Sequence, residues 1–391
     1  SGGPAIRTDG SISPCSLLDV SYGNILTDSI EDIYESEIFQ NLMDRKLEGR
    51  CGECQHKLIC GGFRVFYFRQ LKAPIAVVWE ITNNCNYRCP HCRAYMDVTK
   101  DDEVVEERVI QQLISNEVMS VNISGGEPLL NPRILNIIKA FSDENIDVGI
   151  SSNGWLYPKM AEKLKKAGQT FLQVSVDGPK EIHDAFRGVN GAFENAMKSL
   201  VIAKELGIRT QMNVTITSKN ISTLDYNLEL AQKLGIDRIF YRRVVPAGKG
   251  KENIYILPNK EEYLRVIKRL SSIKSDVIDI AIDDPIVSVI QNPEGADNNA
   301  ISCTAGIKSL GIDSNANVYP CIFLREKVGN LMDDSLQEIW TKSEILSNLR
   351  KHDIGACGKC KYNFVCGGCR AYSGLYEKDA MCPKDFMESL L

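Results

Sequence analysis

Cysteine placement constrains this chain more than any other feature. The 391 residues include 14 cysteines but only four histidines. The cysteines form three groups with short internal spacings that leave none over, and C-x-x-C spacing brings two thiolates close enough to share one metal centre. The pattern indicates thiolate-bound metal and suits zinc as well as iron–sulfur clusters. The groups are Cys15, Cys51, Cys54 and Cys60; Cys85, Cys89 and Cys92; and Cys303, Cys321, Cys357, Cys360, Cys366, Cys369 and Cys382.

Composition limits the partners and the cellular compartment that we expect for this protein. Lys plus Arg number 46 and Asp plus Glu 51, and the resulting net charge of −5 argues against a nucleic-acid partner. No apolar run approaches the ~20 residues that a membrane span needs, and no secretory leader opens the sequence. Disulfide scaffolds are usually short and secreted. We therefore expect reduced thiols in a cytoplasmic protein with neither nucleic acid nor membrane as a partner.

Part of the sequence is repeated. The segment Ser13–Tyr34 aligns with Tyr319–Trp340, and Cys51–Arg64 aligns with Cys357–Arg370. The first copy has four cysteines, enough for one cluster, whereas the seven of the second copy suit two clusters with one ligand missing. The first copy is alternatively a structural remnant or a zinc knot. The repeat predicts three domains: a cysteine-rich domain at 1–70, a central domain at 71–300 and a second cysteine-rich domain at 301–391.

The central region alternates apolar strand-like runs with amphipathic helical patterns. Such alternation predicts a parallel sheet, either doubly wound or barrel-like, with ligands at the carboxyl ends of the strands. The expected strands are Ala76–Thr82, Met119–Ser124, Asp147–Ser152, Phe171–Asp177, Arg209–Ile216 and Arg238–Val245. The expected helices are Val105–Ser115, Arg133–Asn145, Pro158–Ala167, Ala192–Leu206, Leu224–Leu234 and Lys260–Leu270.

The loop after the first expected strand holds Cys85, Cys89 and Cys92 in C-x-x-x-C-x-x-C spacing. Three thiolates hold three irons of a 4Fe–4S cube and leave the fourth iron open for a substrate or cofactor. The same difference separates catalytic from structural zinc sites. The loop is therefore not built like a closed electron carrier. His91 is expected to pack its ring beside the cluster.

Polar motifs follow the next strands. Glycines in Gly125-Gly126-Glu127 allow the backbone to approach a ligand closely, and Glu127 is a candidate acceptor for an ammonium group. Side chains at the end of the third strand are suited to sugar hydroxyls. Further polar residues at these positions are Ser152 and Asn153 after the third strand and Ser175, Asp177 and Arg187 after the fourth.

Taken together, these motifs resemble those of the radical S-adenosylmethionine (AdoMet) enzymes. The resemblance implies a partial (β/α)6 TIM-like barrel, with small cysteine-rich iron–sulfur domains at both ends of the chain. It assigns the three-cysteine loop to a 4Fe–4S cluster whose open iron binds the amino and carboxylate groups of AdoMet. The implied AdoMet-binding residues are Gly125, Gly126 and Glu127 at the methionine amine, Ser152 and Asn153 near the ribose, Ser175, Asp177 and Arg187 around the rest, and Asn213 and Thr215 near the adenine.

The C-terminal copy resembles the cysteine-rich SPASM extension of that family, and the N-terminal copy resembles half of it. The extension binds one or two auxiliary clusters, and the N-terminal cysteines would add one more. The resemblance assigns one auxiliary cluster to Cys357, Cys360, Cys366 and Cys382, and the other to Cys303, Cys321 and Cys369. The second of these lacks a fourth cysteine, so either another residue completes it or one iron is open to substrate.

The implied activity is cleavage of AdoMet to a 5′-deoxyadenosyl radical, which abstracts a hydrogen atom from a peptide or protein side chain. Auxiliary clusters would move electrons or bind substrate, and flavodoxin or ferredoxin would donate the electron. One alternative is radical decarboxylation of tetrapyrrole propionates. The basic residues Arg242, Arg243, Lys249 and Lys251 would either pair with acidic groups of a tetrapyrrole or of an acidic leader peptide, or form a solvated basic rim. The alternative from another class is a non-catalytic iron–sulfur electron carrier.

Overall fold

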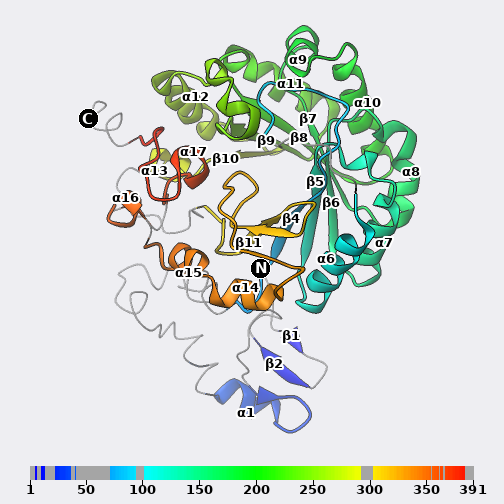
Figure 1. Cartoon of the computed structure of the whole chain (residues 1–391), viewed down its shortest axis with the longest axis vertical. Helices are drawn as coiled ribbons and strands as arrows, with labels where there is room; N and C mark the ends of the chain where they lie inside the picture. The colour runs from blue at the N-terminus through cyan, green and yellow to red at the C-terminus, as the bar shows by residue number, and fades with distance from the viewer. Residues whose placement is uncertain are drawn as a thin grey trace.

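The structure is a computed structural model of residues 1–391. It describes residues 5–6, 10–13, 23–36, 40, 71–93, 101–291, 303–353, 355–360, 362–363 and 366–383. Most of the described residues form one α/β body, and a small three-stranded sheet lies near the N-terminus (Figure 1).

The described strands of the main sheet follow the order β10-β9-β8-β7-β6-β5-β4-β11-β12-β13. Neighbours are parallel from β10 to β11, and the last two pairs are antiparallel. No pairing joins β10 to β13 in this part of the chain, so the sheet is open, as a partial barrel requires. The strands are β4 (Ala76–Thr82), β5 (Ser120–Gly125), β6 (Asp147–Ser152), β7 (Phe171–Ser175), β8 (Arg209–Ile216), β9 (Arg238–Arg243), β10 (Asp279–Asp283), β11 (Ser309–Ile312), β12 (Asn317–Tyr319) and β13 (Gly329–Asn330).

The six strands expected from the sequence are β4 to β9, and the prediction of a parallel sheet is confirmed. β10 and the three strands from the C-terminal region were not predicted from the sequence. In β10 an Asp at each end leaves only three apolar residues, which is too short for a recognisable pattern. β11 extends the sheet beyond β4, so the C-terminal region continues the central sheet.

Helices cover the outer face of the sheet (Figure 1). α7 shows why: Ile134, Ile137, Ile138 and Phe141 recur at helical spacing and are all buried. The helices are α6 (Glu103–Ser115), α7 (Ile134–Asp143), α8 (Tyr157–Ala167), α9 (Lys180–Arg187), α10 (Ala192–Glu205), α11 (Leu224–Leu234), α12 (Lys260–Ser272), α13 (Val287–Gln291), α14 (Leu336–Lys342), α15 (Glu344–Lys351), α16 (Gly355–Gly358) and α17 (Arg370–Ser373). Short 3-10 turns are η1 (Pro128–Leu130), η2 (Ile221–Thr223), η3 (Gly248–Lys251) and η4 (Ile254–Ile256).

The C-terminal region packs directly on the barrel. The indole N–H of Trp340 on α14 donates to the Leu71 carbonyl at 2.6 Å, and the Leu336 N–H donates to Gln112 Oε1 at 2.7 Å. Apolar residues of both regions, such as Trp79 and Trp340, belong to one continuous buried core. The two regions therefore stabilise each other.

The described N-terminal elements repeat the C-terminal ones. They are β1 (Ala5–Ile6), β2 (Ser11–Ser13), β3 (Gly23–Asn24) and α1 (Ile30–Glu35). Ser29 caps α1 with Asp32 in a capping box, as Ser335 caps α14 with Glu338. β3 and β13 both consist of Gly-Asn. The described part of the first copy, residues 23–34, thus forms the same local structure as its counterpart in the second copy.

No helix among the described residues is both long enough and apolar enough to span a membrane.

Candidate active site

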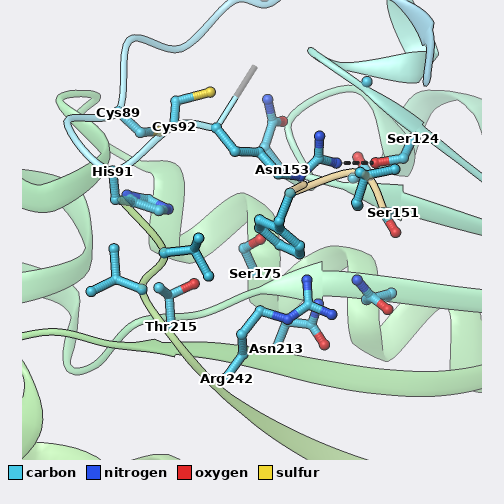
Figure 2. Close-up of a pocket in the computed structure, with 18 of the residues that line it drawn as sticks. Cys89, His91, Cys92, Ser124, Ser151, Asn153, Ser175, Asn213, Thr215 and Arg242 are labelled. Carbon is cyan, nitrogen blue, oxygen red and sulfur yellow. Dashed lines mark hydrogen bonds between the residues drawn. The ribbon is translucent and has the colours of Figure 1, made fainter. Parts of the chain in front are cut away.

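A cavity of about 230 Å³ lies at the carboxyl ends of the central strands. Figure 2 shows Cys89, His91 and Cys92 on one side of it and Arg242 across from them. Cys85, Cys89 and Cys92 all line this cavity, so the structure brings the three cysteines of the predicted loop to one place. Predicted AdoMet-binding residues that also line it are Gly125, Gly126, Ser152, Asn153, Ser175, Arg187, Asn213 and Thr215.

The strands build this cavity by alternation. Along β7, Leu172 and Val174 are fully buried, whereas Gln173 and Ser175 line the cavity. The amide of Gln211 on β8 donates to Gln173 Oε1 at 3.0 Å and so continues the polar face across the sheet. Parallel strands with two covered faces are usually apolar throughout, so polar residues at every second position are the sequence signal for such a cavity. Cavity-lining residues that were not predicted include Asn122, Ser124, Gln173 and, outside the strands, Arg93 and Phe323.

The cysteine loop is shielded by aromatic rings. Tyr87 and Cys89 are buried with Ala192, and Trp155 packs against them edge-on to Tyr87 at a centroid distance of 6.1 Å. Burial raises the pKa of the Cys85 thiol to about 11. None of the described cysteines is in a disulfide. A metal is what stabilises buried thiolates, and binding it releases their protons.

The described side chains contain no group of three or more His, Cys, Asp or Glu arranged around a single metal ion. A 4Fe–4S cube does not require the ligands to surround a single ion, because each thiolate binds a different iron. Three thiols that line one cavity are therefore compatible with such a cluster.

The glycine turn packs closely on the cysteine loop. A Cβ on Gly125 would lie 2.3 Å from the Thr82 carbonyl oxygen, and one on Gly126 would lie 2.2 Å from that of Asn84. The Gly126 N–H donates to the Thr82 carbonyl at 2.8 Å, and the Glu127 N–H donates to the Asn84 carbonyl at 2.7 Å. Glycine is therefore required for contact between β5 and the loop. Both N–H groups are engaged in these hydrogen bonds and are therefore not available as donors to a ligand.

The Glu127 carboxylate is fully buried and does not line the cavity. It accepts from the Asn153 N–H at 2.8 Å, the Ser152 hydroxyl at 2.9 Å and the Leu129 N–H at 3.2 Å. Burial raises the pKa of Glu127 to about 7, although these hydrogen bonds oppose the rise. In the structure Glu127 thus fixes the end of β6, and its predicted contact with a ligand amine stays a prediction.

Asp177 and Arg187 form a buried pair next to the cysteine loop. Arg187 Nε donates to Asp177 Oδ2 at 2.7 Å, and Nη1 lies 3.8 Å from the Cys89 sulfur. Burial would lower the pKa of Arg187, but Asp177 and Cys89 outweigh it and raise that pKa. Asp177 does not line the cavity itself. It holds Arg187, which does, and it also accepts from the Thr215 N–H at 3.3 Å.

A segment after β9 packs on the other side of the cysteine loop. Gly248 has φ +53°, and a Cβ there would lie 2.7 Å from the Cys92 carbonyl oxygen. The Lys249 N–H donates to that same carbonyl at 2.9 Å. His91 stacks on Phe186 with ring centroids 4.5 Å apart, as expected for a ring that packs beside the site. Burial lowers the pKa of His91 to about 3, and the ring is therefore neutral.

Of the basic residues considered for acidic substrates, Arg243 also lines the cavity, but two carboxylates already pair with it. It is buried, and it pairs with Asp284 at 2.9 Å and with Asp379 of the C-terminal region at 2.6 Å. Arg243 therefore links the barrel to the C-terminal region. Arg242 lines the cavity and is partly exposed.

The C-terminal cysteines gather in two places. Cys357, Cys360, Cys366 and Cys382 line one small cavity, the set assigned above to one cluster. Burial raises the pKa of the Cys303 thiol, and the thiols of Cys369 and Cys321 add to the rise because they lie nearby. Cys15, Cys51, Cys54 and Cys60 lie outside the described residues.

Fold and site together define an enzyme class in which a thiol loop and a glycine turn share one cavity at the strand ends. The profile of the radical SAM superfamily matches residues 79–231, and that of SPASM, an iron–sulfur cluster-binding domain, matches 3–55 and 303–367. The chain belongs to the radical SAM superfamily and is a radical SAM enzyme with a SPASM domain. The second profile matches both ends of the chain, in agreement with the internal repeat.

Relatives with assigned activities include two kinds of enzyme. An AdoMet-dependent heme synthase of Methanosarcina barkeri is 29% identical over 334 residues, which cover 76% of this chain and 92% of the relative. Mycofactocin maturase MftC of Mycobacterium tuberculosis is 30% identical over 316 residues, 78% of this chain and 80% of the relative. The solved structure of Streptococcus suis SuiB bound to S-adenosylmethionine has a TM-score of 0.66 at 19% identity, covering 89% of this chain and 88% of that one. This last similarity supports the fold.

Proposed function

We propose that the cavity binds a 4Fe–4S cluster and AdoMet, and that the enzyme uses them to remove a hydrogen atom from a substrate C–H bond. Cys85, Cys89 and Cys92 would hold three irons of the cluster. When bound, the cluster supplies the electron that cleaves AdoMet, and the deoxyadenosyl group takes up the hydrogen atom. The observation that carries the proposal is that these three thiols and the glycine turn share one cavity.

The chain's own residues would bind and orient AdoMet. The carbonyl oxygens of the glycine turn would accept from its amine, and Glu127 would hold Ser152 and Asn153 in place for the ribose. Asp177 would orient Arg187 toward the rest of the cofactor. Side chains on β8, Asn213 and Thr215, would lie at the adenine.

Buried aromatic residues would keep water away from the reacting atoms. Tyr87 and Trp155 cover the cysteine loop on one side, and the stacked rings of His91 and Phe186 cover another. A reactive carbon-centred species needs this protection, because stray C–H and S–H hydrogen donors would end the reaction early.

The C-terminal region would hold auxiliary clusters. Cys357, Cys360, Cys366 and Cys382 already line one cavity and would hold the first. Cys303, Cys321 and Cys369 would hold the second with an additional, non-cysteine ligand or an open iron. A flavodoxin or ferredoxin would supply the electron for the core cluster.

The first candidate substrate is a peptide or protein side chain. MftC, a maturase, is 30% identical to this chain and supports this interpretation. The second candidate is a tetrapyrrole with propionate side chains. It is favoured by Arg242, which lines the cavity, and by the similarity to a heme synthase along 92% of that enzyme.

AdoMet cleavage tests the proposal. Anaerobically reconstituted protein with dithionite and AdoMet should form 5′-deoxyadenosine, and AdoMet should change the electron paramagnetic resonance spectrum of the reduced core cluster. Cys89→Ala should abolish both effects. Cys382→Ala is the matched control, because Cys382 lines a separate cavity, and it should keep the AdoMet-dependent spectral change. A wild-type spectrum that AdoMet leaves unchanged would contradict the proposal.

A further inference from the structure

The ring of Phe323 lies between two arginines at the active-site cavity. Arg93 Cζ is 5.2 Å from its centroid, and Arg242 Cζ is 4.7 Å from it. Arg93 follows the cysteine loop, Arg242 is on β9, and Phe323 comes from the C-terminal region two residues after Cys321. All three residues line the cavity. Three distant segments therefore converge on one point of its wall.

The arginines around this ring outnumber the carboxylates that pair with them. Glu80 is buried and serves two guanidinium groups: it pairs with Arg93 through Oε1 and with Arg325 through Oε2 at 2.6 Å. Arg242 pairs with Asp283 at 2.7 Å. Within the described ion pairs, three guanidinium groups here share two carboxylates.

The extra positive charge is largely removed from water. The side chains of Arg93 and Arg242 are 15% and 26% exposed. A charge in such surroundings is costly unless an anion pairs with it. Both residues line the cavity, so an anion that enters the cavity is the natural partner.

The geometry is also specific. Both guanidinium groups lie within cation–π range of the Phe323 ring, at 5.2 and 4.7 Å from its centroid, and each carries its N–H donors in a rigid planar fork. A planar fork of this kind matches the two oxygens of a carboxylate. In Figure 2 Arg242 lies beside Asn213 and Thr215, across the cavity from Cys89 and Cys92. A ligand bound at Arg242 would lie next to the adenine proposed above for Asn213 and Thr215 and away from the cysteine loop.

We propose that Arg93 and Arg242, with Phe323 between them, form a subsite that binds a carboxylate of the substrate. The proposal rests on the function proposed above, since that function is what brings a substrate into this cavity. The carboxylate belongs to a tetrapyrrole propionate or to the end of a peptide. Both sources present the same group to the two arginines, and the test separates them.

Equilibrium binding to the reconstituted wild-type protein is the test, measured anaerobically without reductant or turnover. The probes are iron coproporphyrin III against its tetramethyl ester, and a peptide with a free C-terminal carboxylate against the same peptide as its amide. We expect one carboxylate probe to bind at least tenfold more tightly than its neutral partner, and the pair that differs identifies the source. Equal affinity within both pairs, or binding of neither carboxylate, overturns the proposal.

A matched pair of variants locates the effect. Arg242→Gln should weaken binding of the carboxylate probe roughly 10- to 100-fold, as expected for a hydrogen bond to a charged group, and Arg242→Lys should recover part of it. Arg238→Gln is the control, because Arg238 forms the equivalent ion pair with Asp279 at the other end of β9 and does not line the cavity. Arg238→Gln should bind like wild type.

Two further measurements separate a role of Arg242 at the substrate from a role at the auxiliary cluster. If Arg242→Gln alters the visible spectrum of the auxiliary clusters but not the affinity for the probe, the charge serves the nearby Cys321 site and the proposal fails. Formation of 5′-deoxyadenosine by the wild type is measured separately. If no 5′-deoxyadenosine forms, the proposed function is contradicted. If it forms but the protein does not distinguish the carboxylate probes from their esterified or amidated partners, only the subsite is contradicted.

Discussion

The titration of Glu127 offers a quantitative test of the site. Its pKa is raised from 4.5 to about 7 by burial. A carboxyl group whose pKa is higher in the folded state stabilises the fold while it is protonated. That contribution is complete below about pH 4.5 and is lost as the pH rises through about 7. Stability should therefore fall with rising pH, the opposite of the usual effect of a paired carboxylate.

The size of the effect follows from the two pKa values. One pKa unit corresponds to about 1.4 kcal/mol, so the full difference of about 2.5 units corresponds to roughly 3 kcal/mol. About 1.4 kcal/mol of this should be lost between pH 6 and pH 8.5, a range that suits iron–sulfur proteins. The group is fully buried, so solvent screening does not reduce this estimate.

This loss of stability is measured by anaerobic guanidinium denaturation of wild type and Glu127→Gln at pH 6 and at pH 8.5. The free energy of unfolding of the wild type should fall by about 1.4 kcal/mol more than that of the variant. Glu103→Gln is the control for removal of one charge, since the Glu103 side chain is 66% exposed. Parallel behaviour of wild type and Glu127→Gln would refute the argument, because it would mean that Glu127 does not titrate in this range.

Two further substitutions test the contacts around the cavity. Gly248→Ala should displace the cysteine loop, since its Cβ would lie 2.7 Å from the Cys92 carbonyl oxygen, and iron content after reconstitution should fall by about one cluster. Gly207→Ala has a similar backbone strain at φ +69° but no neighbour within 4 Å, so it should keep its iron; equal iron loss in both would contradict the steric argument. Asp379→Asn should lower the free energy of unfolding by about 3 kcal/mol, because it removes one charge from a buried pair with Arg243, and an effect below about 1 kcal/mol would contradict that pairing.

The fold of the central region could be predicted because its local and long-range signals agree. Each expected strand and helix from 76 to 270 is present, and α7 and α11 differ from expectation by two residues or fewer at either end. Gly168 and Gly235, both with positive φ, end α8 and α11 where the apolar pattern stops. β10 carried no such signal, and its place beside β9 is set by tertiary pairing alone.

The candidate site was predictable only where chemistry requires a particular residue type. The cysteine spacing and the glycine turn were visible in the sequence, because iron–sulfur clusters are mostly bound by cysteine and only glycine allows contact with the loop. Phe323 was not predictable, since a single aromatic residue after Cys321 looks like any core residue. Its position depends on how the C-terminal region packs against the barrel, a long-range effect that no local pattern records.

This packing has a consequence for the domain boundary expected at residue 301. β11 pairs with β4 in parallel, and Leu310 and Ile312 share the core of Val77 and Trp79. Removal of residues 303–391 would leave β4 as an open edge with an uncovered apolar face, which is prone to aggregation. We expect residues 71–302 expressed alone to be insoluble, whereas a central domain with its own closed core would be soluble and monomeric by size-exclusion chromatography. The C-terminal region is then part of the catalytic body, because it completes both the sheet that carries the cysteine loop and the wall that carries Phe323.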